Sequence, residues 1–375
     1  MTNKKRFVFA LATFVGTVMG VGLFGLPYVG VQSGYLILVM YLFIGAGIVI
    51  VINFLYSEVA VNTKGLHRLP GYAAIYLGAG GKRAAFIVKS LALFGALLAY
   101  LIIGGQFLAS LFGGPVILYT FIFLILGSFL IWQDSKSVGA VEFALLFVFL
   151  AIVIFLFAAG VSKIDLNNLV TVKINNFFVP YGIVLFSLWG ASIVPEIKEQ
   201  LKNNLKQVKQ VVFWGVLICV AVYLLFSTLI IGISGTATSR DGISSLSDHF
   251  GELILFIGYV FGIITTFTSF IALGLTVKKL FLYDYHLPKI VAWSLATFVP
   301  LGLFVIGLQD FIAVIGITGA VMLGLDGVLV TLVYLSMKRR QKPANYVKLK
   351  ILGSSLIFLL SVGVVLQIFY TINGY

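Results

Sequence analysis

Charged residues are scarce in this sequence: they make up 10% of its 375 residues, whereas 61% are apolar. Soluble domains contain roughly 45–50% apolar and about 25% charged residues, so this chain would expose large apolar patches in water. The composition therefore excludes an ordinary soluble enzyme, a nucleic-acid-binding domain and a disordered chain. One cysteine, Cys219, excludes an internal disulfide. These shortages indicate a polytopic membrane protein.

Eleven segments are long and apolar enough to cross a bilayer, because one helical crossing takes roughly 20 residues. Their continuous apolar character excludes a β-barrel, whose strands alternate polar and apolar residues. We therefore expect an all-α polytopic membrane protein with 11 transmembrane helices. The predicted spans are about 7–31, 35–60, 85–111, 116–132, 140–160, 178–200, 211–233, 252–282, 289–307, 311–336 and 351–370.

The basic residues are distributed unequally between the two ends of these spans. Of 25 Lys and Arg, only Lys163, Lys173 and Arg240 fall on one side, which leaves 22 on the other. Cytoplasmic loops favour Lys and Arg, so the N-terminus is predicted in the cytoplasm and the C-terminus outside. We expect a plasma membrane location, the inner membrane in a bacterium. The net charge of +13 thus reflects the membrane topology, and no nucleic acid partner is expected. The oligomeric state stays open.

A repeat is visible in the spacing of the spans. Spans five apart in order start 167 to 176 residues apart, and five is odd, so a second copy would be inverted. The prediction is an inverted repeat of five spans, 7–160 and 178–336, plus an additional span at 351–370. Many secondary transporters have this arrangement and bind substrate between the repeats. The alternative is that evenly sized helices produce such regularity by themselves.

Two spans contain residues that interrupt helices. The first holds four glycines and a proline between Gly16 and Pro27, and the sixth holds Gly190 and Pro195. A glycine costs a helix up to about 1 kcal/mol and a proline about 3 kcal/mol. Interrupted helices at corresponding places in two halves point to a transporter site. The alternative is glycine for close packing and proline for a kink.

The chemistry of such breaks suits a zwitterion. Backbone N–H groups at the new helix start after Gly22 favour a carboxylate. Carbonyls freed at the broken ends favour an ammonium group or a metal cation. The run from Gly20 to Gly25 also fits a dinucleotide-binding pattern, which we reject because no strand precedes it.

Other polar residues lie at a similar depth. The hydroxyls of Thr265, Thr268 and Ser269 could coordinate Na⁺ together with carbonyls at Met19 and Gly20, since hard cations prefer oxygen. Such hydroxyls also often bond back to their own helix.

Asp326 is the one acid close to the predicted middle of the bilayer. An ionised carboxylate there costs at least about 2.5–3.5 kcal/mol, which indicates a functional or a paired group. A proton-carrying role and a structural role both stay open for Asp326.

At these residues the chain resembles the amino acid/auxin permease family, in particular its bacterial aromatic amino acid permeases. That family belongs to the amino acid/polyamine/organocation superfamily. The resemblance covers nearly the whole chain and rests on Gly16–Tyr28, Tyr100–Gly105, Gly190–Glu196, Ile264–Leu275 and Phe311–Met337.

The resemblance implies a leucine-transporter-like fold and import of amino acids coupled to Na⁺ or H⁺, without another cofactor. It implies that Tyr100 and Trp189 shape the side-chain pocket. The fifth span lacks the lysine that some proton-coupled relatives carry. By resemblance, the substrate carboxylate would bind backbone at Gly20, Val21, Gly22, Leu23 and Phe24, and the ammonium group would bind carbonyls at Phe186, Ser187 and Trp189.

The favoured function is an ion-coupled symporter for neutral or aromatic amino acids that works by alternating access. A carrier of the same fold for an amine or a nucleobase is the first alternative. A membrane-embedded enzyme would need a cluster of His, Asp or Glu at one depth, and a channel would need a charged ring or an oligomeric filter. The sequence shows neither pattern, so we expect no enzyme.

Overall fold

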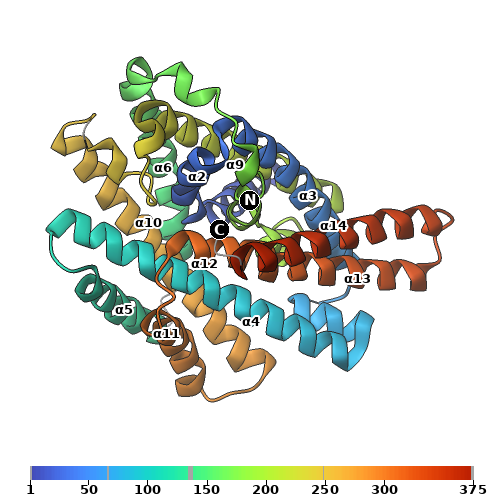
Figure 1. Cartoon of the computed structure of the whole chain (residues 1–375). Helices are drawn as coiled ribbons and strands as arrows, with labels where there is room; N and C mark the ends of the chain where they lie inside the picture. The colour runs from blue at the N-terminus through green and yellow to red at the C-terminus, as the bar shows by residue number, and fades with distance from the viewer. Residues whose placement is uncertain (1, 66, 134–137, 248, 373–375) are drawn as a thin grey trace.

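The computed structural model describes residues 2–65, 67–133, 138–247 and 249–372. Over these ranges all regular structure is helical (Figure 1). The α-helices are α1 Asn3–Val18, α2 Gly22–Ser33, α3 Tyr35–Asn62, α4 Leu69–Phe112, α5 Val116–Trp132, α6 Val138–Gly160, α7 Pro180–Leu188, α8 Val194–Gln200, α9 Leu205–Ser234, α10 Glu252–Lys279, α11 Lys289–Val305, α12 Phe311–Ile317, α13 Gly324–Gln341 and α14 Tyr346–Ile372.

Short helices fill several connections. Six are 3-10 turns and two are π-helical segments. The 3-10 turns are Val161–Lys163, Leu166–Leu169, Ile174–Asn176, Ala191–Ile193, Gly235–Ala237 and Ser244–Leu246, and the π-helical segments are η7 Leu280–Asp284 and η8 Thr318–Leu323.

Every predicted span overlaps one helix or a run of two or three consecutive helical segments. Within the described residues, seven helices are long and apolar enough to cross a membrane, or eight if the bent pair α1 and α2 is one span. Three shorter apolar helices coincide with the other predicted spans: Val116–Trp132, Phe147–Lys163 and Lys289–Val305. The chain is therefore a multi-pass membrane protein.

Two groups of packed helices are joined by the segment from α12 to α13. In one group, α1 lies against α9, and α2 and α7 lie against both α3 and α9. In the other, α4 runs diagonally across the view of Figure 1 and packs against α5, α10 and α11. The segment from α12 to α13 contacts α7 and α3 of the first group and α4 of the second. The space between these groups holds the cavity described below.

Two spans differ from the predictions. The third begins 16 residues earlier than expected, because α4 starts at Leu69 and bends at Gly78, whose φ of +80° favours glycine. The tenth span contains η8, which presses against α7 so closely that backbone meets backbone. A Cβ atom on Gly319 would lie 1.8 Å from the Gly182 carbonyl oxygen. Glycine at both positions permits this contact.

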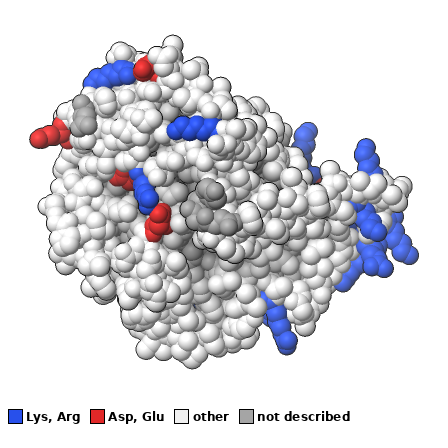
Figure 2. Space-filling model, in the orientation of Figure 1, with Lys and Arg blue, Asp and Glu red and all other residues white. Residues whose placement is uncertain are grey.

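The connections between α3 and α4, α8 and α9, and α13 and α14 lie at one end of the helices, which we call the basic side. Figure 2 shows Lys and Arg gathering over the projecting ends of α13 and α14. Three lysines counted with these end charges are instead inside the protein. Lys198 and Lys278 are 4% and 1% exposed and donate to backbone carbonyls of neighbouring segments. Lys89 faces Asp326 between helices.

The close crossing of η8 and α7 gives a first prediction. Gly319→Ala should destabilise the protein by about 1–3 kcal/mol, because the added methyl group has no space. The measurement is the thermal unfolding midpoint in detergent. Gly302→Ala in α11 is the control, since nothing lies within 4 Å of a Cβ there. Equal midpoints for the two variants would contradict the crossing.

Candidate functional site

The first span is broken, as the sequence predicts. Helix α1 ends at Val18 and α2 begins at Gly22, and their axes differ by 55°. The break falls on Met19–Val21, within the glycine-rich run. Pro27 lies inside α2, so glycine rather than proline interrupts this span.

The sixth span is broken at the corresponding place. Helix α7 ends at Leu188, Trp189 and Gly190 are not helical, and α8 follows a short 3-10 turn. Pro195 occupies the first turn of α8, where the lack of an N–H group costs nothing. Proline thus starts the second half-helix and does not cause the break.

A tyrosine from α9 joins the two breaks. The hydroxyl of Tyr223 lies 2.7 Å from the carbonyl oxygen of Ser187 and 3.1 Å from that of Val18, and it donates between them. Both carbonyls stand at helix ends, where the next turn supplies no donor. Sequence reasoning missed Tyr223, because a tyrosine in an apolar span has many packing roles.

The broken ends also touch directly. A Cβ atom on Gly22 would lie 2.3 Å from Ser187 Oγ and 2.8 Å from its Cα, so α2 starts against the end of α7. A Cβ atom on Gly20 would lie 2.1 Å from the Tyr100 hydroxyl. The glycines therefore let three segments meet at one point.

A cavity of about 250 Å³ extends from this meeting point toward the basic side, where Arg68 and Glu196 line it. Eight of the residues predicted for substrate or ion binding are on its wall. They are Gly20, Gly22, Tyr100, Phe186, Ser187, Trp189, Ser269 and Asp326. Leu23 is not on its wall and is buried in the protein core.

A second, smaller pocket of about 30 Å³ lies behind the first break. It collects the predicted ion-binding positions on α10 and the break itself. Both Thr265 and Thr268 donate to carbonyls of their own helix, while their oxygen lone pairs stay available. The predicted residues on its wall are Met19, Gly20, Val21, Phe24, Tyr100, Thr265, Thr268 and Ser269.

Asp326 lies in the first turn of α13, 1% exposed. Its Oδ2 atom accepts a hydrogen bond from Trp189 Nε1 at 3.1 Å and one from Lys89 Nζ at 3.4 Å. Its Oδ1 atom is buried and has no partner among the described residues. The Trp189 indole is thus held toward α13. In the sequence Lys89 falls near the predicted start of the third span. That its side chain reaches the cavity follows only from the packing.

An aromatic cluster lies on the side opposite the basic side. Phe24 packs edge-on against Phe107 and Phe226, at centroid distances of 5.0 and 6.1 Å. Above them Arg240 forms an ion pair with Asp310 at the start of α12. The Asp310 carboxylate raises the pKa of Arg240, since a nearby negative charge favours the guanidinium form.

Comparison with known proteins identifies the family. The sequence pattern of the tryptophan/tyrosine permease family matches residues 3–370. The chain belongs to this family. The predicted membership in the amino acid/polyamine/organocation superfamily is thereby confirmed. No curated protein matches the chain.

Solved structures show the same fold for this permease family member. Mhp1, a nucleobase-cation-symport-1 family transporter in a closed conformation with bromovinylhydantoin bound, is 15% identical, with a TM-score of 0.66 over 96% of this chain and 90% of that one. The Eremococcus coleocola manganese transporter, in complex with an aromatic bis-isothiourea substituted compound, is 12% identical, with a TM-score of 0.56 over 98% and 95%. Family and fold together indicate a secondary transporter for a small molecule.

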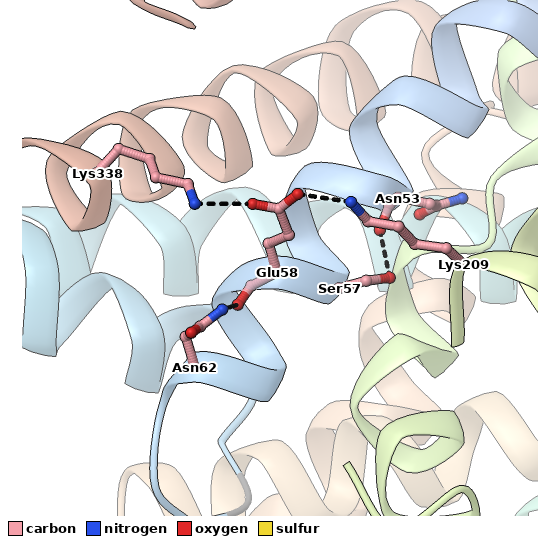
Figure 3. Close-up of polar contacts among 6 residues, drawn as sticks. All are labelled: Asn53, Ser57, Glu58, Asn62, Lys209 and Lys338. Carbon is pink, nitrogen blue, oxygen red and sulfur yellow. Dashed lines mark hydrogen bonds and ion pairs between the residues drawn. The ribbon is translucent and has the colours of Figure 1, made fainter. Parts of the chain in front are cut away.

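Outside the cavity, Glu58 of α3 joins this permease's helices by ion pairs (Figure 3). Its two carboxylate oxygens face Lys209 of α9 at 2.5 Å and Lys338 of α13 at 3.0 Å. Each oxygen of this carboxylate therefore has its own cation, and three helices are held together. In the part of the chain that the structure describes, no group of three or more His, Cys, Asp or Glu could hold a metal ion.

The bridge between the two breaks gives a second prediction. Tyr223→Phe should destabilise the permease by about 1–3 kcal/mol, because two buried carbonyls lose their donor. The thermal unfolding midpoint should fall. A ligand that raises the midpoint of the parent protein should raise that of the variant by less. Tyr285→Phe is the control, since Tyr285 is 41% exposed. A wild-type midpoint in Tyr223→Phe would show that the hydroxyl does not support the breaks.

Proposed function

We propose that this protein is a secondary active transporter that imports neutral or aromatic amino acids together with Na⁺ or H⁺, by alternating access. One observation carries the proposal: two broken helices, tied by Tyr223, meet at one cavity in a member of the tryptophan/tyrosine permease family. Broken helices supply both a partial positive helix start and free carbonyls, which suit the two charges of an amino acid.

The substrate is proposed to lie between the half-helices. The start of α2 at Gly22 would bind the carboxylate, through the backbone of the run from Gly20 to Phe24. The end of α7 would bind the ammonium group through carbonyls at Phe186, Ser187 and Trp189. The Ser187 carbonyl already accepts from Tyr223, and its second lone pair would serve the substrate. Tyr100 would border the side chain of the amino acid.

The coupling ion would bind in one of two places. Oxygens of Met19, Gly20, Thr265, Thr268 and Ser269 border the small pocket, whose size suits a bare cation such as Na⁺. Asp326 would carry a proton in the alternative.

The proposed topology has eleven crossings, a cytoplasmic N-terminus, an outer C-terminus and the inner membrane of a bacterium as its location. Two inverted repeats, 7–160 and 178–336, and an additional span at 351–370 would make up the chain. Support comes from breaks in the first and sixth spans and from the basic side. In this topology the cavity faces the cytoplasm and the aromatic cluster around Phe24 closes the outside.

The same fold also serves other solutes, since structures of similar fold come from a nucleobase-cation-symport family member and from a manganese transporter. A nucleobase or an amine is therefore the alternative substrate. The family membership and the absence of a cluster of acids among the described residues on the cavity wall favour an amino acid.

Uptake into proteoliposomes tests the proposal. Twenty labelled amino acids would be offered with Na⁺ and H⁺ gradients imposed separately. Accumulation of neutral or aromatic amino acids under one gradient is expected. Folded protein that accumulates none of the twenty under either gradient would contradict the proposed substrate class.

The contact between α2 and α7 gives a prediction on the site itself. Gly22→Ala should abolish measurable substrate binding, because its Cβ atom would collide with the backbone of Ser187 and separate the half-helices. Binding would be measured by scintillation proximity on purified protein. Gly47→Ala in α3 is the control, since nothing lies within 4 Å of a Cβ there. Wild-type binding by Gly22→Ala would refute the placement of the substrate.

A further inference from the structure

Glu58 and Asp326 both lie between helices of this protein, and they are paired differently. Each oxygen of Glu58 has its own lysine, at 2.5 and 3.0 Å (Figure 3). Asp326 is more deeply buried, yet its single lysine lies 3.4 Å away and one of its oxygens has no partner among the described residues. A buried ion pair stabilises a protein only when its geometry and its hydrogen bonds are good. The pairing of Asp326 is therefore a poor structural device.

The position of Asp326 beside the large cavity favours a functional role over a structural one. Asp326 and Lys89 both line the large cavity, and the Lys89 side chain is 13% exposed. The cavity thus connects the Lys89–Asp326 pair with the basic side, where Arg68 and Glu196 line it. The Glu58 cluster does not border this cavity.

The other charged and titratable groups around Asp326 come from each neighbouring element. Lys89 on α4 is the cation paired with Asp326, and Tyr56 of α3, Arg68 and Glu196 also line the cavity. The neighbouring η8 contributes apolar and hydroxyl side chains only. Helix α14 contributes apolar contacts at this level, such as Leu360 beside Gly327. Lys89 is thus the group that decides whether the Asp326 charge is compensated.

Asp326 is also tied to the substrate position. Trp189, which donates to the same carboxylate oxygen, stands at the break of the sixth span. Lys89, Asp326 and Trp189 come from α4, α13 and the connection between α7 and α8, so a change in the charge of Asp326 acts on three elements that border the cavity.

On the basis of the proposed transport function, we infer that Asp326 is the site where the coupling proton binds, and that Lys89 is the tethered cation that replaces this proton. In the paired state the carboxylate is ionised and Lys89 neutralises it. When a proton from cavity water adds to the carboxylate, Asp326 becomes neutral, and the Lys89 ammonium group turns toward the cavity. Release of the proton to water restores the pair. No covalent bond other than the O–H bond forms or breaks.

A measurement without substrate tests the proton site alone. Trp132, Trp214 and Trp293 would be replaced by Phe, so that Trp189 is the only tryptophan. Its emission should change when the pH is varied between about 4 and 9. The change should disappear in Asp326→Asn and persist in Lys338→Met, which disturbs the Glu58 cluster instead. The same pH-dependent change in Asp326→Asn as in the parent would overturn the inference.

A transport measurement then tests the coupling. Gradient-driven accumulation should fall about tenfold or more in Asp326→Asn and in Lys89→Met, within the usual range of coupling factors. Exchange of internal for external substrate without a gradient should remain measurable in both variants, because neither change alters the half-helix ends at Gly22 and Ser187 that are proposed to bind the substrate. Lys338→Met should keep both activities, and Asp326→Glu should restore part of the accumulation.

The outcomes separate the two proposals. Absence of exchange in the parent protein would refute the proposed substrate class, while the fluorescence result would still decide whether Asp326 binds a proton. Exchange together with undiminished H⁺-driven accumulation in Asp326→Asn and Lys89→Met would refute the coupling site. Accumulation by the parent that depends on Na⁺ and is indifferent to the proton gradient would refute it as well.

Discussion

The structure depends on which groups form hydrogen bonds with the backbone N–H and C=O groups where two helices break inside the membrane. Each unpaired N–H or C=O group costs several kcal/mol there, so a break persists only where protein groups or a wet cavity replace the lost helix bonds. The Tyr223 hydroxyl donates to carbonyls at the ends of α1 and α7. The non-helical residues Gly20 and Trp189 border the cavity. Because one hydroxyl serves both ends, the two breaks are held together as a single site.

Close backbone contact is the second condition for this site. Gly22 lets α2 begin directly against Ser187, and Gly182 and Gly319 bring α7 against η8. The sixth span is therefore held between the first and the tenth, and any motion that opens the site must move these contacts together. Under the proposed function, the packed aromatic cluster on one side and the cavity that reaches toward the basic side on the other correspond to one state of an alternating-access cycle.

The two carboxylates between helices, Glu58 and Asp326, differ in how they are paired and in where they lie. Glu58, with a lysine on each oxygen, connects α3, α9 and α13 away from the cavity. Asp326, with a weaker pair and an unpaired oxygen, borders the cavity and the broken sixth span. The well-paired carboxylate thus lies away from the cavity and the poorly paired one borders it, which is why the two suit different roles.

Composition and apolar run length by themselves determined that the chain is an all-helical membrane protein, because the bilayer admits few alternatives. The glycines at 16–25 and 190 also determined where the first and sixth spans break, since helix propensity is a local property. The partners of the buried polar groups were decided only by the tertiary structure: Tyr223 between the breaks, Lys89 on Asp326, and the close crossing at Gly319. These contacts join residues more than 30 positions apart, and no local pattern specifies which distant side chain reaches a given buried atom.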